Sequence, residues 1–294
     1  MDNLIINEEL LGQIETLQSI LKNNVAGMFG GLRRSKRLGS SSEFADYREY
    51  MPGDDVSKID WNAYARFDKL YEKLYYDERQ MHTKIYIDAS RSMQYGNAKK
   101  AEQAIKLAAA FAYLSSCEMD KVSVYAVSGG NVTEIVSGIV GKEAYLSEIG
   151  KLNSIVFDGE VSISEAIMPS KVGMGDGYSI VISDFLTDSN YEDAIDHLAG
   201  KKRDVICLQV LSREELNPQI RGKMHLFDSE DQRRSYRKNI DKEIIKAYKE
   251  ALEYTKNRIK GYCESRGANY MLVTAEDSLS DILLSKLIDN GVLK

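Results

Sequence analysis

An apolar run near residue 86 ends in a carboxylate and two hydroxyls at alternating positions. The stretch YIDASRSM, residues 86–93, contains Asp88, Ser90 and Ser92. In extended backbone, alternate side chains point the same way, so these oxygen-bearing groups can converge. A second carboxylate, Asp184, directly follows the apolar run SIVIS. Two carboxylates and two hydroxyls form the kind of all-oxygen ligand set that hard divalent cations such as Mg²⁺ prefer.

The same residue types have a second common role. Asp and Ser after a strand cap helices and form tight turns without any metal. Short motifs carry a high false-positive risk, so the spacing alone leaves both interpretations open. If a metal is held, neutral hydroxyls leave its charge incompletely balanced. A carboxylate of another protein would then be attracted to it.

The elements that must position these residues follow an α/β pattern. Apolar, β-branched runs occur at residues 84–87, 122–127, 179–182, 205–211 and 270–273. Helical stretches occur at residues 98–117, 191–199, 241–264 and 278–289. This alternation predicts a mostly parallel sheet with helices on both faces. Ligands of such sheets bind beyond the carboxyl ends of the strands, which is where Asp88 and Asp184 stand. Gly129-Gly130-Asn131 predicts a hairpin and one antiparallel strand at the sheet edge.

The first 82 residues differ from the rest. Apolar positions from Leu4 to Leu21 repeat at helical spacing and predict an amphipathic helix. A glycine-rich basic stretch follows, and then a segment dense in aromatic and charged residues, with a Pro-Gly-Asp-Asp turn at residues 52–55. We therefore expect an N-terminal helix and accessory segment over residues 1–82 and an α/β domain over residues 83–294.

Composition bounds the class of protein. The 294 residues are 43% hydrophobic and 29% charged, which is typical of a globular protein with a sizeable core. The net charge of −6 gives no reason to expect nucleic-acid binding. No run reaches 18 apolar residues, and the acidic start lacks the positive region of a signal peptide, so we expect a cytoplasmic protein without a membrane span. The three scattered cysteines are expected to be buried, reduced thiols.

Other charged groups have simpler interpretations. The run RRSKR, Arg33–Arg37, is either a solvated loop or a contact for a phosphate, an anionic lipid or an acidic protein surface. Asp54, Asp55 and Asp60 form a second acidic group near Arg48 and Arg66, and salt bridges that lock this segment onto the sheet domain are the favoured explanation. A second metal site or a catalytic carboxylate pair is the alternative, which no other feature of the sequence supports. Trp61 and the nearby tyrosines are expected to seal that junction.

Two groups of motifs resemble known families. The D-x-S-x-S strand end, the Ala-rich helix after it and the later Ser-Asp strand end resemble the metal-ion-dependent adhesion site of von Willebrand factor A domains. The upstream elements Arg48–Asp55 and Ile59–Arg66 resemble the R-E-Y-x-P-G-D-D and I-D-W-x-A-x-A-R signature of bacterial proteins catalogued as domain of unknown function 58. Asp228 and Glu230, in HLFDSED, resemble the late D-x-E element of that family. The resemblance extends from about Gly31 to the C-terminus.

The resemblance implies a von Willebrand A-like, Rossmann-like sheet with an adhesion-type site for Mg²⁺ or Mn²⁺. The ligands would be Asp88, Ser90, Ser92 and Asp184. The family's site normally takes a further Thr from a loop between the two strands. In DGEVSISEAI, strict placement puts Val161 there, with Ser162 next to it. Either Ser162 substitutes through a small shift in register, or the metal is bound weakly.

The resemblance also implies a partner. Such proteins are commonly encoded beside MoxR-type AAA+ ATPases and are thought to act with them as adaptors. Many carry transmembrane helices, and this chain resembles the short form without them. We therefore expect a non-enzymatic adaptor that binds a MoxR-type ATPase or its client in complex assembly or maturation. A magnesium-dependent, phosphatase-like hydrolase is an alternative, although the sequence offers no histidine base at the site. A metal-free scaffold is another.

Overall fold

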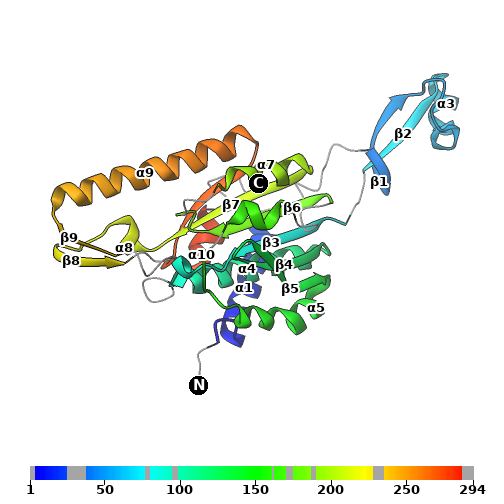
Figure 1. The fold of residues 1–294 in the computed structure, drawn as a ribbon. Coiled ribbons are helices and arrows are strands. Elements are labelled where there is room, and N and C mark those ends of the chain that lie inside the picture. Colours follow the sequence, from blue (N-terminus) through cyan, green and yellow to red (C-terminus); the bar gives the residue numbers. More distant parts are fainter. Residues whose placement is uncertain are drawn as a thin grey trace. The chain divides into compact units, whose positions relative to one another are not determined.

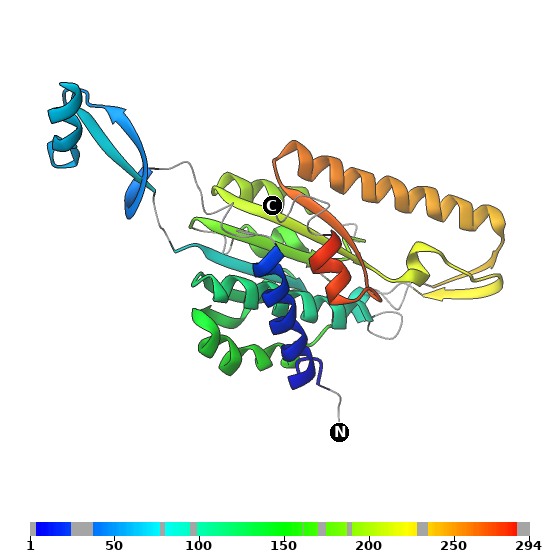
Figure 2. The same cartoon turned by 180° about the vertical axis from the view of Figure 1, so that it is seen from behind.

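The structure is a computed structural model that describes residues 4–24, 38–76, 80–94, 99–160, 162–169, 175–186, 190–227 and 235–286. The chain divides into two compact units (Figures 1 and 2). The large unit contains residues 1–24 and 81–293, and the small unit contains residues 25–80.

The large unit is built around a six-stranded sheet. Its strands are β3 (His82–Asp88), β4 (Lys121–Ser128), β5 (Asn131–Ile139), β6 (Gly177–Ser183), β7 (Arg203–Leu211) and β10 (Asn269–Thr274), in the spatial order β10-β7-β6-β3-β4-β5. All neighbours are parallel except β4 and β5. Gly129 and Gly130 join these two strands with positive φ angles of 54° and 74°, as a tight hairpin turn requires. The predicted α/β sheet and its antiparallel edge strand are therefore confirmed.

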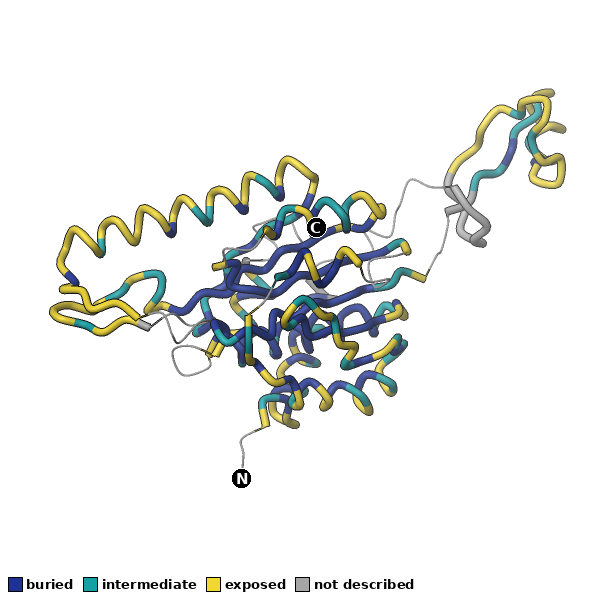
Figure 3. The backbone as a smooth tube through the Cα atoms, viewed as in Figure 1, coloured by how far each residue is buried: buried dark blue, intermediate teal, exposed yellow. Residues whose placement is uncertain are grey.

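Helices cover both faces of this sheet. On one face, Tyr86, Val181 and Cys207 belong to a buried apolar cluster with side chains of α6 (Ile163–Ile167), α7 (Glu192–Gly200) and α9 (Lys242–Ser265). On the other face lies α4 (Lys99–Cys117), which contacts β3, β4, β6 and β7. Figure 3 shows the central strands buried along most of their length, whereas α9 is largely exposed. The alternation of apolar residues on each strand explains the two packed faces.

The N-terminal helix belongs to the large unit. Helix α1 (Glu8–Asn24) buries Leu10, Ile14 and Leu17 and contacts α4. The main chain of Ile6 exchanges two hydrogen bonds with the Asn153 side chain, at 2.9 and 3.1 Å. We expected this helix to be grouped with the accessory segment in residues 1–82. The structure groups it with the sheet domain instead, because its apolar side is buried against that domain.

Shorter elements complete the large unit. They are η2 (Arg91–Gln94), α5 (Gly141–Glu148), η3 (Ile149–Ser154), α8 (Arg213–Leu216), the β8 (Gly222–Phe227) and β9 (Ser235–Ile240) hairpin, α10 (Leu279–Asp281) and η5 (Ile282–Lys286). The hairpin was not predicted. Cys207 and Cys263 are buried free thiols, and Cys117 is a half-buried one. Among the described helices, none is both long and apolar enough to cross a membrane.

The small unit is a two-stranded hairpin with a short helix. Strands β1 (Leu38–Glu49) and β2 (Tyr71–Tyr76) pair antiparallel, and η1 (Val56–Lys58) and α3 (Trp61–Phe67) lie between them in sequence. The expected Pro-Gly turn is present, with Gly53 at a φ of 110°. Asp60 caps α3 by accepting hydrogen bonds from the backbone N–H groups of the second and third helical residues. The I-D-W motif therefore starts a helix.

Candidate functional site

Two neighbouring strands deliver the two candidate carboxylates to the same edge of the sheet. Ile87 of β3 pairs with Ile182 of β6, so Asp88 ends one strand beside the end of the other. Asp184 follows β6 directly. Asp88 and Asp184 are only 4% and 2% exposed. The structure therefore brings together the two carboxylates that the sequence places 96 positions apart.

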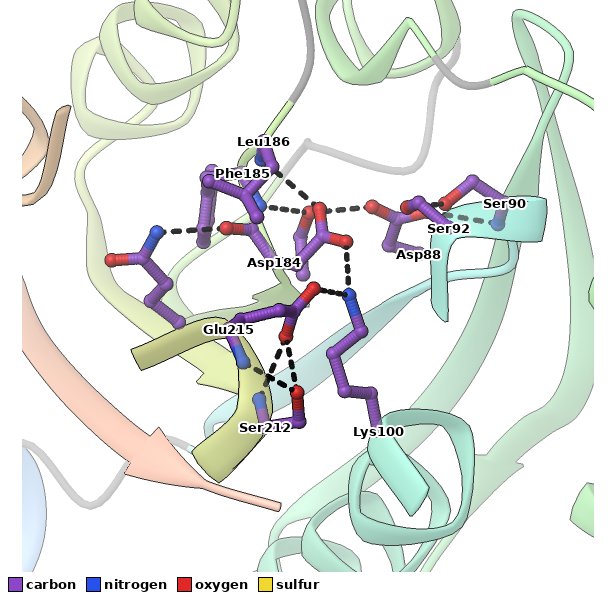
Figure 4. A network of polar contacts seen from close by, with 11 residues as sticks. Asp88, Ser90, Ser92, Lys100, Asp184, Phe185, Leu186, Ser212 and Glu215 are labelled. Atoms are coloured by element: carbon purple, nitrogen blue, oxygen red, sulfur yellow. Dashed lines mark hydrogen bonds and ion pairs between the residues drawn. The ribbon is translucent and has the colours of Figure 1, made fainter. Parts of the chain in front are cut away.

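Asp88 is held by neutral donors. Its Oδ1 accepts a hydrogen bond from the Ser90 N–H at 2.9 Å, and its Oδ2 accepts one from the Ser183 hydroxyl at 2.5 Å (Figure 4). The Ser90 and Ser92 hydroxyls lie 2.9 Å apart, and both serines are buried. Among the described residues, none forms an ion pair with Asp88. Burial, together with repulsion from Asp184, raises the pKa of Asp88 to about 6.

Asp184 has a cationic partner that the sequence analysis missed. Lys100, near the start of α4, donates to Asp184 Oδ2 at 2.8 Å and to Glu215 Oε1 at 2.6 Å (Figure 4). The side chain of Lys100 is 1% exposed. Burial opposes its charge, but the attraction of Asp184 and Glu215 outweighs burial and raises the pKa of Lys100. The only sequence signal was a lysine inside an otherwise buried, Ala-rich helix.

Glu215 comes from a third strand end. It lies in α8, directly after β7, and forms a reciprocal capping box with Ser212. Its Oε2 accepts hydrogen bonds from the Ser212 N–H at 2.7 Å and the Ser212 hydroxyl at 3.0 Å. This leaves Oε1 for Lys100. The pattern S-R-E-E, residues 212–215, is typical of a capping box, but it does not predict that Glu215 contacts Lys100 of α4.

The donor set and charge of this site fit a hard divalent cation. Lys100 pairs with Asp184 and Glu215, so the neighbouring buried Asp88 has no cationic partner among the described residues. The neighbouring serine hydroxyls add the oxygen donors that Mg²⁺ and Mn²⁺ accept. Over the described ranges, no group of three or more His, Cys, Asp and Glu side chains forms a metal site. A metal at Asp88 therefore depends on the two hydroxyls.

The loop expected to supply a further ligand is attached beside the site. The Asp158 N–H donates to the carbonyl of Ala89 at 2.9 Å, and the Arg91 N–H donates to the carbonyl of Gly159 at 3.0 Å. The hydroxyl of Ser162 caps α6, where it accepts a hydrogen bond from the Glu165 N–H at 3.4 Å. Val161 lies outside the described residues. The role of Ser162 as a ligand stays a prediction.

The remaining candidates lie elsewhere. Arg33–Arg37, Asp228 and Glu230 fall outside the described residues. We expected the aspartates of the small unit to form salt bridges with the sheet domain. Arg48 pairs with Asp54 at 2.9 Å instead, and both residues belong to the small unit.

Two further ion pairs have the same character. Arg48 pairs with Glu72 at 2.7 Å, and Lys73 pairs with Asp60 at 3.2 Å, both within the small unit. The Trp61 side chain, which we expected to seal a junction, is exposed. These contacts stabilise the β1–β2 hairpin and α3 because they connect both strands with the segment between them.

Several known proteins are similar to this chain. Uncharacterized proteins of Mycobacterium bovis and Mycobacterium tuberculosis are 25% identical to this chain over 234 residues, which is 77% of this chain and 73% of each relative. An aerotolerance-related membrane protein from Bacteroides fragilis is 16% identical, with a TM-score of 0.41 over 72% of this chain and 100% of that chain. The SpRpn10 VWA domain is 8% identical, with a TM-score of 0.39 over 70% of this chain and 94% of that chain.

The order of the strands in the large sheet identifies its architecture. In chain order the six strands are arranged 3-2-1-4-5-6, which is the doubly wound, Rossmann-like order that the resemblance to von Willebrand A domains implies. The sequence model of the family described as "Protein of unknown function DUF58" matches residues 46–258, which is more than half of the chain. The chain therefore belongs to the DUF58 family.

Proposed function

We propose that this protein is a non-enzymatic protein-binding module that uses a divalent cation at the carboxyl edge of its sheet. Asp88, Ser90 and Ser92 would hold Mg²⁺ or Mn²⁺, with Asp184 beside them and Ser162 as a further candidate. When bound, the ion supplies a positive charge with coordination positions open to an acidic side chain of a partner protein. The observation that supports this most is a buried carboxylate, Asp88, that meets only neutral donors.

The surrounding residues prepare the site. Lys100, which also donates to Glu215, fixes Oδ2 of Asp184, and the Leu186 N–H donates to its Oδ1 at 3.0 Å. Ser183 fixes Asp88 and also accepts a hydrogen bond from the Phe185 N–H at 2.9 Å. Both carboxylates are therefore oriented before any ligand arrives, which lowers the entropy cost of binding.

We further propose a MoxR-type AAA+ ATPase or its client as the partner, acting in the cytoplasm in complex assembly or maturation. Membership of the DUF58 family supports this choice, since such proteins are commonly encoded beside those ATPases. The acidic side chain that completes the site would belong to that partner. The site itself needs no chemistry on the ligand.

A metal titration tests the proposal. Millimolar Mg²⁺ or Mn²⁺ should raise the melting temperature of the chain, because a ligand that binds only the native state stabilises it by about 2.7 kcal/mol at a hundredfold excess over Kd. Asp88→Asn and Ser92→Ala should abolish this response. Asp68→Asn, at an exposed carboxylate outside the site, should keep it. Isothermal calorimetry on the same samples measures the binding directly.

Partner capture and turnover separate the alternatives. A MoxR-type ATPase should be retained by the immobilised chain in Mg²⁺ and released by EDTA, and Asp88→Asn should not retain it. No metal response in either measurement would leave the metal-free scaffold as the explanation. Magnesium-dependent hydrolysis of a generic phosphoester that is lost in Asp184→Ala would establish the hydrolase instead.

A further inference from the structure

The small unit exposes a row of aromatic side chains on α3. Trp61, Tyr64 and Phe67 are 62%, 41% and 67% exposed. Because they are three residues apart, they lie on one side of the helix. No residue of α3 is buried. Neighbouring apolar side chains with this much exposure are typical of contact surfaces.

A cleft of about 590 Å³ borders this helix. Its walls include Tyr47 of β1 and Tyr71 of β2, whose rings pack edge to face with their centroids 6.2 Å apart. From α3 come Asn62, Arg66 and Phe67. Arg66, and Ala63 beside it in the cleft, hold fixed positions of the I-D-W-x-A-x-A-R signature, and the proposed metal site uses neither residue. The volume lies in the range of ligand pockets and suits two or three side chains.

One charge in the cleft is unbalanced. The Asp60 carboxylate accepts a hydrogen bond from the Tyr47 hydroxyl at 2.9 Å, pairs with Lys73 at 3.2 Å and caps α3. Arg66, in contrast, forms no hydrogen bond or ion pair through its side chain with any described residue. The cleft therefore presents a free guanidinium between aromatic walls. A guanidinium recognises a carboxylate through two parallel hydrogen bonds.

We propose that this cleft binds a short acidic segment of a partner protein. A carboxylate of the segment pairs with Arg66, and a neighbouring apolar side chain packs against Phe67 and Tyr71. A nucleic acid suits the cleft less well, because phosphate-backbone binding draws on several cations and Arg66 is the one unpaired cation among the described cleft residues. This contact is independent of the site at Asp88.

Fluorescence anisotropy of a labelled peptide tests the proposal on the full chain. The probe is a fluorescein-labelled, capped Leu-Asp-Leu-Phe-Glu-Leu peptide, titrated in EDTA so that the Asp88 site has no influence. Arg66→Gln should weaken binding at least tenfold, whereas Arg66→Lys should lose less. Lys69→Gln, at an exposed cation outside the cleft, should bind like the unmodified chain. The peptide with Asn and Gln in place of its acids should bind the unmodified chain as weakly as the acidic peptide binds Arg66→Gln.

A second measurement locates the peptide. Trp61 is the single tryptophan of the chain, so its emission should shift to shorter wavelength when the peptide covers α3. Phe67→Ala should weaken binding while circular dichroism shows the fold intact. Equal affinity of Arg66→Gln and the unmodified chain would overturn the proposal, as would no binding at about 1 mM. Tighter, Arg66-dependent binding of a single-stranded oligonucleotide would replace the acidic segment by a nucleic acid.

Discussion

The two edges of the central sheet treat buried charge in opposite ways. At the carboxyl edge, Asp88 and Asp184 lie together with one ammonium between Asp184 and Glu215. At the amino edge, β7 begins with the buried Arg203, which donates to the carbonyl of Gly175 at 2.5 Å and to that of Tyr178. Arg203 at the amino edge thus donates to neutral carbonyls of the main chain.

The pKa values follow this difference. At the amino edge, burial and the neighbouring cations lower the pKa of His82 to about 4 and that of Lys84 to about 8. At the carboxyl edge, burial and a like charge raise the pKa of Asp88 to about 6. The amino edge avoids its excess charge by keeping His82 neutral. At the carboxyl edge, serine hydroxyls lie next to the negatively charged Asp88. Carboxylate and hydroxyl oxygens together suit a divalent cation.

The largest predicted effect removes the cation that pairs with the buried Asp184. Lys100→Met should cost about 3–5 kcal/mol of unfolding free energy, because it leaves the buried Asp184 without its charge partner. The neighbouring Lys99→Met is the control, since Lys99 is half exposed and lies 3.9 Å from Glu276, so its loss should cost less than about 1 kcal/mol. Urea denaturation measures both. Equal losses of unfolding free energy in the two variants would show that the buried Lys100 ion pair does not stabilise the fold more than the exposed one.

At the amino edge the corresponding substitution should cost somewhat less. Arg203→Met leaves buried carbonyls and the Ser179 hydroxyl without their donor, which we expect to cost about 2–3 kcal/mol. The carboxylates that attract Arg203 are the exposed Asp204 and the half-buried Asp176, so the cost stays below that of Lys100→Met, which leaves the buried Asp184 without its cation. The exposed Arg213→Met should change stability by about 0.5 kcal/mol at most. A larger loss of unfolding free energy in Arg203→Met than in Lys100→Met would contradict this difference between the two edges.

The smallest predicted effect concerns pH. His82 is neutral in the fold, and its Nε2 lies 3.0 Å from the Ser123 hydroxyl. In the unfolded chain it takes up a proton near its ordinary pKa of 6.5, whereas the folded-state pKa is about 4. Stability is therefore lost as the pH falls from about 6.5 to about 4, by about 1–2 kcal/mol after allowance for solvent screening. His82→Gln should reduce this slope in urea denaturation between pH 7 and 4. An unchanged slope would contradict the assignment.

Local patterns in the sequence predicted most of the sheet. The β-branched runs, the Gly129-Gly130 hairpin and the long helices near residues 98–117 and 241–264 all occur in the structure, since period and turn chemistry determine them locally. The meeting of Asp88 and Asp184 followed from the rule that parallel strands end at one edge. Their metal-binding role remains a prediction.

Contacts between distant residues were not predictable in the same way. Lys100 reaches Asp184 and Glu215, which are 84 and 115 positions away, and no local pattern encodes such a contact. The place of α1 depends on which surface its apolar side covers, which periodicity does not reveal. The β8–β9 hairpin consists mainly of exposed residues and has Ile240 as its single β-branched residue, so it lacks the buried, β-branched run that identifies a strand.

The single tryptophan, Trp61, has a consequence for how cooperativity can be observed. Because it lies in the small unit, its fluorescence during denaturation follows that unit alone, whereas far-ultraviolet circular dichroism is dominated by the helices of the large unit. Coincident curves from the two signals would mean that the units lose their structure as one thermodynamic body, and separated curves would mean that each melts independently.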